Sequence, residues 1–243
     1  MTSLTDKGIQ AVVVNHNTSK FTELMLRTLY DKHSPDLDLS ITVMDNDSTD
    51  ETPELTVYLA SKQIPFMQSA FSIDTERNSH GEVLSQFVLA NPDCTYYLFL
   101  DADIYFLKEK TIDDMLSTLN SESGLFGVGT RQTWDGIEEI PTEIHPKIYE
   151  SRLHPCCALI KNSPIFQSIV KEVGLTGVTS HGATDEVYWD TCECMTKVMK
   201  THGYHHAICS SMVYHFFSVS YDDQYMDRKN RDCNELLKTL RNL

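Results

Sequence analysis

Short apolar runs alternate with amphipathic segments through the first half of the chain. Runs rich in valine or aromatic residues extend from Ile9 to Val14, from Leu39 to Met44 and from Tyr96 to Leu100. Runs of this length and composition predict buried strands. Between the first two runs, apolar residues recur every three or four positions from Phe21 to Leu29, which predicts an amphipathic helix.

Three further helices are predicted between and after these strands. One covers Pro53 to Lys62 with proline at its first position, and another covers about Ser79 to Leu89. A third begins at Thr111, where Asp114 completes a capping box. Strands separated by helices of this length imply βαβ crossovers and a mostly parallel sheet. The predicted class is therefore α/β, with a Rossmann-like nucleotide-binding half over about residues 8–130.

The second half of the chain has a less regular pattern. Residues 131–152 show no clear periodicity, which predicts a long loop over a site. Order returns with a strand at Cys156 to Ile160, a helix at Pro164 to Glu172 and a longer helix at Asp185 to His202. A last helix is predicted within residues 223–243. We expect one domain over residues 1–243, in which residues 131–222 build the acceptor half.

Composition narrows the classes of function. A formal net charge of -15 and a pI near 5.0 disfavour binding to nucleic acid or to an anionic membrane. No apolar run approaches the roughly 20 residues that span a bilayer, and the start does not resemble a secretion signal. The seven cysteines form no CxxC pair. Reduced thiols and a cytoplasmic location are therefore expected.

Asp101-Ala102-Asp103 follows directly on the apolar run that ends at Leu100. Two carboxylates at the end of a buried strand are costly to desolvate unless a cation compensates, and oxygen ligands suit Mg²⁺ or Mn²⁺. By itself the pair also fits a solvated turn or a helix cap.

Four segments in order, VVVNHNT, VMDNDSTDET, RNSHGEVLSQ and YYLFLDADIYF, resemble the amino-terminal half of a GT-A fold glycosyltransferase. The resemblance is to the large family of inverting, metal-dependent enzymes. It covers about residues 8–130, and it implies a nucleoside diphosphate sugar as donor.

The resemblance implies a set of donor-binding residues on the loops at the strand ends and before the third helix: Asn15, His16, Asn17, Asp45, Asp47, Arg77 and Asn78. Asp45 would accept a hydrogen bond from the ring N–H of the base, and Arg77 and Asn78 would lie near the diphosphate or ribose. Taken alone, Asn17 equally fits a helix N-cap, and Asp45 or Asp47 fits a polar turn.

The same resemblance implies a metal site. Asp103 would coordinate Mn²⁺ or Mg²⁺ directly, Asp101 would hold the ribose or a metal-bound water, and Ala102 would lie beside the donor. The late segment VYHFFSVSY resembles the one that supplies a histidine ligand, which makes His215 the candidate. Without the resemblance, a histidine on an aromatic strand fits an ordinary core residue.

An acid for the acceptor side is implied at the start of a helix in the second half. Asp185 and Glu186 fit best, because the first turn of the predicted helix would keep them ionised for proton abstraction. Acidic residues also favour a first turn without any catalytic role. Relatives more often carry a Glu-Asp pair where this chain has Thr191-Cys192.

The sequence thus predicts a metal-dependent inverting glycosyltransferase. It would move a sugar from a nucleoside diphosphate donor, UDP in preference to GDP, to a hydroxyl of a glycan or small acceptor. The alternatives are a nucleotidyltransferase, a glycosyltransferase acting on modified DNA bases, and a non-catalytic protein that binds sugar nucleotides or glycans.

Overall fold

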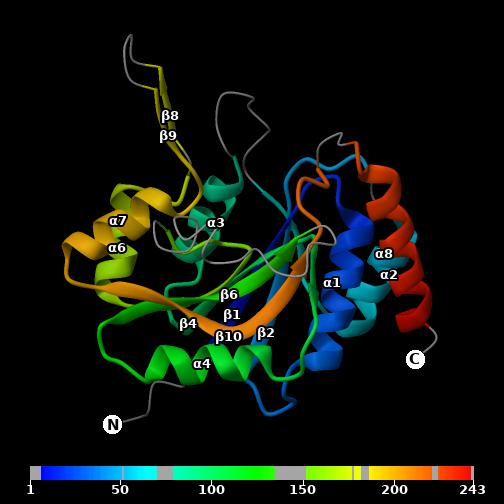
Figure 1. The fold of residues 1–243 in the computed structure, drawn as a ribbon, viewed down its shortest axis with the longest axis horizontal. Coiled ribbons are helices and arrows are strands. Elements are labelled where there is room, and N and C mark those ends of the chain that lie inside the picture. Colours follow the sequence, from blue (N-terminus) through cyan, green and yellow to red (C-terminus); the bar gives the residue numbers. More distant parts are fainter. Residues whose placement is uncertain are drawn as a thin grey trace.

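A computed structural model of the chain shows an α/β fold (Figure 1). It describes residues 7–50, 52–69, 79–134, 152–176, 178–181, 186–220 and 224–241. The strands are β1 (Lys7–Asn15), β2 (Leu39–Asp45), β3 (Phe66–Gln68), β4 (Cys94–Asp101), β5 (Ile104–Phe106), β6 (Leu125–Trp134), β7 (Cys157–Lys161), β8 (Val178–His181), β9 (Glu186–Trp189) and β10 (His205–His215). The helices are α1 (Ser19–Lys32), α2 (Pro53–Lys62), α3 (Ser79–Ala90), α4 (Thr111–Asn120), α6 (Pro164–Glu172), α7 (Glu193–Thr201) and α8 (Met226–Arg241).

Eight of the described strands form one sheet in the order β3-β2-β1-β4-β7-β6-β10-β5. The first four are parallel to one another, as predicted for the amino-terminal half. β7 is antiparallel to both of its neighbours, and β10 is parallel to β6. Because two reversals restore the direction, β6 and β10 run the same way as β1, β2 and β4. The carboxyl ends of these five strands therefore meet at one edge of the sheet.

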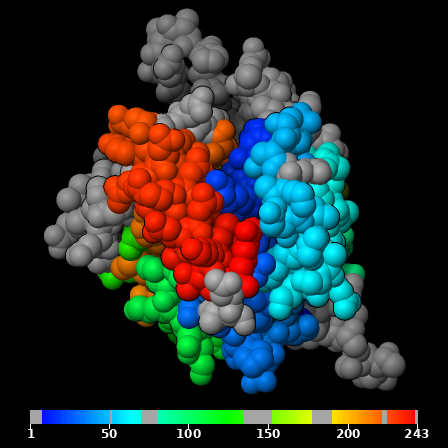
Figure 2. All heavy atoms as spheres, turned by 90° about the vertical axis from the view of Figure 1, so that its right-hand side faces the viewer, coloured from blue at the N-terminus to red at the C-terminus, as the bar shows by residue number. Residues whose placement is uncertain are grey.

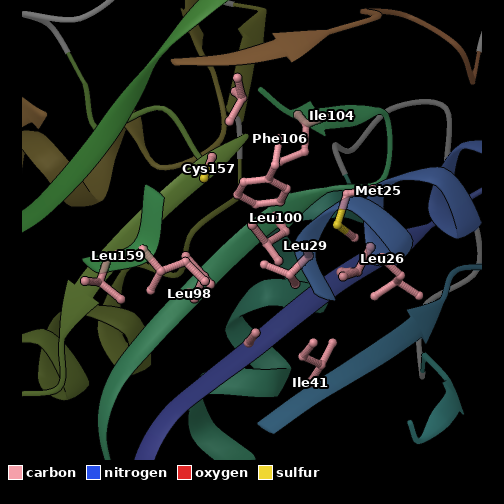
Figure 3. Packing of buried hydrophobic residues seen from close by; sticks show 14 of the residues in the cluster. Met25, Leu26, Leu29, Ile41, Leu98, Leu100, Ile104, Phe106, Cys157 and Leu159 are labelled. Atoms are coloured by element: carbon pink, nitrogen blue, oxygen red, sulfur yellow. The ribbon is translucent and has the colours of Figure 1, made fainter. Parts of the chain in front are cut away.

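Both faces of the sheet are covered by helices. Alternate residues of each central strand point to opposite faces, as the strand period of two requires. Leu98 and Leu100 of β4 belong to the core beneath α1, α2 and α4, which Figure 3 shows in part, whereas Tyr97 and Phe99 belong to the core beneath α3, α6 and α7. A continuous apolar run is what a strand buried on both faces needs.

The carboxyl-terminal helix α8 packs against α1, and Figure 2 shows it beside α1 on the side opposite α2. Their shared apolar cluster includes Phe21, Phe216, Cys233 and Leu237. The carboxyl-terminal helix therefore packs against the body of the protein.

The helix predicted from Asp185 to His202 is wrong in its first part. Residues Glu186–Trp189 form β9, which pairs antiparallel with β8, and α7 begins only at Glu193. The β8–β9 pair projects from the body (Figure 1). Val187, Tyr188 and Trp189 are β-formers, and strand pairing decides their conformation where local capping signals did not.

The first residues of the loop predicted over 131–152 are strand, because β6 continues to Trp134, and residues 135–151 lie outside the described residues. Gly127 and Gly129 lie within this strand and weakened its pattern in the sequence. A Cβ on Gly127 would lie 2.5 Å from Leu153 Cδ2, so the glycine permits a close approach of chain segments rather than marking a turn. The capping box predicted for Thr111 and Asp114 at the start of α4 is not formed. The carboxylate of Asp114 instead accepts from the Ser211 N–H.

Candidate functional site

The shared edge of the sheet gathers most of the predicted site residues that the structure describes. Asn15 ends β1, Asp45 ends β2, Asp101 ends β4 and His215 ends β10. Their strands are direct or near neighbours in the sheet, and Asn15 pairs with Asp45 while Val14 pairs with Asp101. The topology therefore assembles these polar side chains at one place, where α/β sheets commonly bind ligands.

Asn15 is fully buried, and its side-chain amide is engaged by the protein itself. Its nitrogen donates to Asp45 Oδ1 at 2.8 Å and to Ser48 Oγ at 2.9 Å. Its oxygen accepts from Thr18 at 3.0 Å and from Thr22 at 2.7 Å. Both donors and both lone pairs of the amide are occupied. Asn15 thus joins the loop after β1 to the loop after β2, and a nucleoside would compete with these bonds.

Asp45 is also buried, and its Oδ2 accepts from the Ser48 N–H at 3.2 Å and from Gln68 at 3.1 Å. A carboxylate offers about four acceptor positions. Three are used by Asn15, Ser48 and Gln68, which leaves room for one further donor such as the ring N–H of a base. Asp47, two residues on, is exposed and adopts a positive φ of 61°.

The two loops are joined at further points. Asn17 has a φ of 51°, and its side-chain oxygen accepts from the Thr49 N–H at 2.8 Å. His16 Nδ1 lies 2.9 Å from the Asn46 carbonyl. The start of α1 is capped by Asp50, which accepts from the Ser19 N–H at 2.9 Å, so Asn17 is not the helix cap. These bonds pre-form the loop pair.

Asp101, Asp103 and His215 form an acidic centre next to the loops that follow β1 and β2. His215 Nε2 is 3.0 Å from Asp103 Oδ1 and 3.6 Å from Asp101 Oδ2. His80 Nε2 on α3 lies 3.6 Å from the other oxygen of Asp101. The ligand atoms of Asp101, Asp103 and His215 lie within 4.8 Å of one another. Ala102, between the aspartates, is buried in the core.

The hydrogen bond of its other ring nitrogen prepares His215 for a cation. Nδ1 lies 3.1 Å from the side-chain oxygen of Gln132, which can only accept, so Nδ1 carries a proton. Nε2, 3.0 Å from Asp103 Oδ1, donates a proton to that carboxylate when no cation is bound, and it would offer its lone pair to a cation that takes the place of the proton. His154, which also lies near Asp101, has the opposite arrangement. Its Nδ1 accepts the Cys156 N–H at 3.2 Å, which places the ring proton on Nε2.

Electrostatics at the centre also favour positive charge. Burial opposes charging of His215, but the charges of Asp103 and Asp101 outweigh it and raise the pKa of His215. Burial raises the pKa of Asp101, against the opposing charges of His80 and His215. The two carboxylates thus stabilise a cation between them. Carboxylate oxygens with one imidazole fit Mn²⁺ or Mg²⁺, and these residues suit the predicted metal.

Several predicted residues fall elsewhere. Arg77, Asn78 and Asp185 lie outside the described residues. Glu186 opens β9 rather than a helix, so the helix-dipole argument for its ionisation no longer holds.

A pair that the sequence analysis missed lies at the true start of α7. Arg152 forms an ion pair with Asp190 at 2.7 Å and donates to the Thr191 carbonyl at 2.9 Å. The charge of Arg152 also acts on Asp101, and the Asp101 N–H donates to the Cys156 carbonyl at 2.8 Å. Asp190 is therefore linked to the acidic centre through Arg152. The Asp190 N–H donates to Glu193 Oε2 at 3.0 Å, one bond of a capping box, but α7 begins after Cys192, so this spacing marks the helix start only to within two residues.

Thr191 and Cys192, which the resemblance aligned with a Glu-Asp pair, are both buried. Burial raises the pKa of Cys192 to about 12, which keeps its thiol neutral. Neither residue supplies a carboxylate, so an acid at this helix start comes from Asp190 or Glu193.

Among the described residues, no helix is long and apolar enough to cross a lipid bilayer. No family model matches the sequence, and no curated protein matches it.

Solved structures share the fold. A mannosyltransferase, PcManGT from Pyrobaculum calidifontis in complex with GDP-Man and Mn²⁺, matches with a TM-score of 0.59 and 15% identity over 88% of this chain and 58% of that protein. S. aureus TarS matches with a TM-score of 0.59 and 14% identity over 93% of this chain and 39% of TarS. Residues 1–349 of TarS in complex with UDP match with a TM-score of 0.54 and 14% identity over 96% of this chain and 65% of that structure. The chain thus has a fold found in glycosyltransferases and spans less than two thirds of each of these proteins.

Proposed function

We propose that this chain is a metal-dependent glycosyltransferase that transfers a sugar from a nucleoside diphosphate sugar to a hydroxyl group, with inversion at the anomeric carbon. The observation that carries the proposal is the convergence of Asp101, Asp103 and His215 at the edge where β4 and β10 end. Support comes from the shared fold of a mannosyltransferase determined with GDP-Man and Mn²⁺.

In this proposal Asp103 and His215 hold the divalent cation, and Asp101 holds either the donor ribose or water beside it. The cation supplies Lewis-acid stabilisation of the charge that develops on the leaving diphosphate. Gln132 keeps the His215 ring in the tautomer that can serve as a ligand. His80 lies on the other side of Asp101, where a diphosphate would also meet the first turn of α3.

The donor base is assigned to the loop pair after β1 and β2. Asp45 supplies the remaining acceptor position for a ring N–H, and His16, Asn17 and Asp47 line the more accessible part of the loops. Asn15 acts by holding Asp45 in place rather than by touching the base. Uracil and guanine both carry a ring N–H, and we propose UDP ahead of GDP.

The acceptor side is assigned to the start of α7. Asp190 is partly accessible, precedes the positive end of the helix and is held by Arg152. We propose that it takes the proton of the attacking hydroxyl, so that the acceptor oxygen bonds to the anomeric carbon as the bond to the diphosphate oxygen breaks. Asp185 remains the alternative base.

Calorimetric titration tests the donor assignment. UDP and GDP are added to the protein with Mn²⁺ and, separately, with a chelator. We expect UDP binding that requires the metal and exceeds GDP binding. An absence of nucleotide binding under every condition would overturn the proposed function.

Turnover of UDP-sugars, read as release of UDP with and without candidate acceptors, tests the base. Asp190→Asn should lower the turnover number by about 100-fold or more while leaving the Kd for UDP within about threefold. Asp185→Asn is the matched comparison. A loss confined to that variant would move the role to Asp185, and saturable binding without release of UDP by the wild-type protein would identify a non-catalytic binder.

A further inference from the structure

The segment after β10 has a strained backbone beside the metal site. Phe217 and Ser218 adopt φ values of 55° and 51°, in the left-handed region that residues other than glycine rarely occupy. Two such residues in succession persist only where the surroundings hold them.

The conformation places an aromatic ring directly on His215. The rings of Phe217 and His215 are stacked, with centroids 3.8 Å apart and planes inclined by 25°. The bond from Nδ1 to Gln132 fixes one atom of the imidazole, and the stacked ring fixes its plane. Together they set the direction of Nε2, which faces Asp103.

A lysine of the carboxyl-terminal helix holds this turn. Lys229 of α8 is 3% exposed, and its Nζ donates to the Phe217 carbonyl at 2.6 Å. A buried ammonium bonded to a carbonyl is among the stronger hydrogen bonds in a protein. The preceding residue, Phe216, is buried in the α1–α8 cluster, and its N–H donates to the Asp103 carbonyl at 2.9 Å.

We infer that Lys229 is a positioning residue for the metal site, acting on His215 through the Phe217 carbonyl and ring. The inference rests on the proposed function, because it assigns His215 as a ligand. It makes the affinity for the cation depend on how α8 is seated, although α8 contributes no ligand in the proposed site.

The test compares two variants of α8. Lys229→Met keeps the length of the side chain and removes the donor with its charge, whereas Leu237→Ala weakens the packing of the same helix and leaves the Lys229–Phe217 hydrogen bond in place. Calorimetric titration with Mn²⁺ alone should show about a 10-fold weaker Kd for Lys229→Met, the lower end of the range for residues that orient a ligand. Leu237→Ala should stay within about twofold of wild type despite its lower stability. Equal effects of the two variants on the Kd, or none from Lys229→Met, would overturn the inference.

Phe217→Leu removes the stacked ring while leaving Lys229 in place, and it keeps the test decisive if Lys229→Met fails to fold. It should weaken Mn²⁺ binding to a similar extent, and the double variant should be no weaker than Phe217→Leu alone, because both act through one contact. Additive losses would show that Lys229 acts by another route.

Nuclear magnetic resonance of the His215 imidazole in metal-free protein separates failure of this inference from failure of the proposed function. Lys229→Met should shift the ring ¹⁵N and ¹H signals more in wild type than in the Phe217→Leu background, because loss of the lysine charge acts on the imidazole directly in both, and Leu237→Ala should leave the signals unmoved. If the wild-type protein binds no Mn²⁺ but these shifts occur, the contact chain holds and the metal assignment fails. If Mn²⁺ binds and the signals are unmoved, the positioning role fails alone.

Discussion

Replacing Asp103 with asparagine removes one negative charge from the acidic centre while preserving the shape of the side chain. Asp103 is 7% exposed, and its Oδ1 lies 3.0 Å from His215 Nε2. The amide can still meet His215, so the fold should tolerate the change. The effect should therefore fall on cation binding.

The size of the effect follows from the charge removed. Two unit charges about 4 Å apart attract by about 4 kcal/mol at the effective dielectric constant of about 20 that suits protein sites. A divalent cation doubles this to about 8 kcal/mol, and we take the retained amide oxygen and water to recover roughly half. The expected loss is about 4 kcal/mol, or about 1000-fold in the Kd for Mn²⁺.

Calorimetric titration of Mn²⁺ measures this Kd, and UDP titration in the same buffer measures its consequence for the donor. Asp93→Asn is the matched control, because it makes the same chemical change at an exposed position before the opposite end of β4. It should match wild type. A folded Asp103→Asn protein that binds Mn²⁺ as tightly as the control would refute the assignment of Asp103 as a ligand.

Three further predictions concern stability. Gly81→Ala places a Cβ 2.4 Å from the Leu175 carbonyl oxygen and should cost about 1–3 kcal/mol in urea unfolding, whereas Gly124→Ala meets only a movable side chain and should cost less. Arg241→Gln removes one partner of the buried Glu23, which keeps Arg27, and should cost about 1.5 kcal/mol near neutral pH. Burial opposes ionisation of Glu23, but its bonds to the two arginines outweigh burial and lower the pKa of Glu23 below 4.5. The stabilisation from Arg241 is therefore present above pH 4.5 and is lost as the pH falls through the folded-state pKa. An effect of Arg241→Gln that does not shrink in acid would contradict the pairing. Mn²⁺ at about 100 times its Kd should stabilise the fold by about 2.7 kcal/mol, reversed by chelator, and no shift in the unfolding midpoint would argue against a site in the folded state.

The sequence predicted the elements whose signals lie within a few neighbouring residues. The central strands and the helices α1, α2, α3 and α6 follow from apolar periodicity, helix caps and prolines, which act over a few residues. The same signals gave a wrong prediction at residues 186–189, where acids at a supposed helix start outweighed the aromatic and β-branched residues of β9. Pairing with β8 decided that segment, and no local pattern reports the partner of a strand.

The candidate site was likewise predicted in part from local signals and decided in part by the tertiary structure. Paired aspartates after an apolar run, and a resemblance to known motifs, were enough to nominate Asp101, Asp103 and His215 from the sequence alone. Only the tertiary structure brings His215 to 3.0 Å from Asp103, because that contact needs β10 to pair with β5 and β6. The tertiary structure alone also shows that the amide of Asn15 is bonded within the protein and that Asp190 pairs with Arg152, whose charge acts on Asp101. The physical reason is that residue type and spacing fix what a side chain can do, whereas strand order and burial fix which groups it meets.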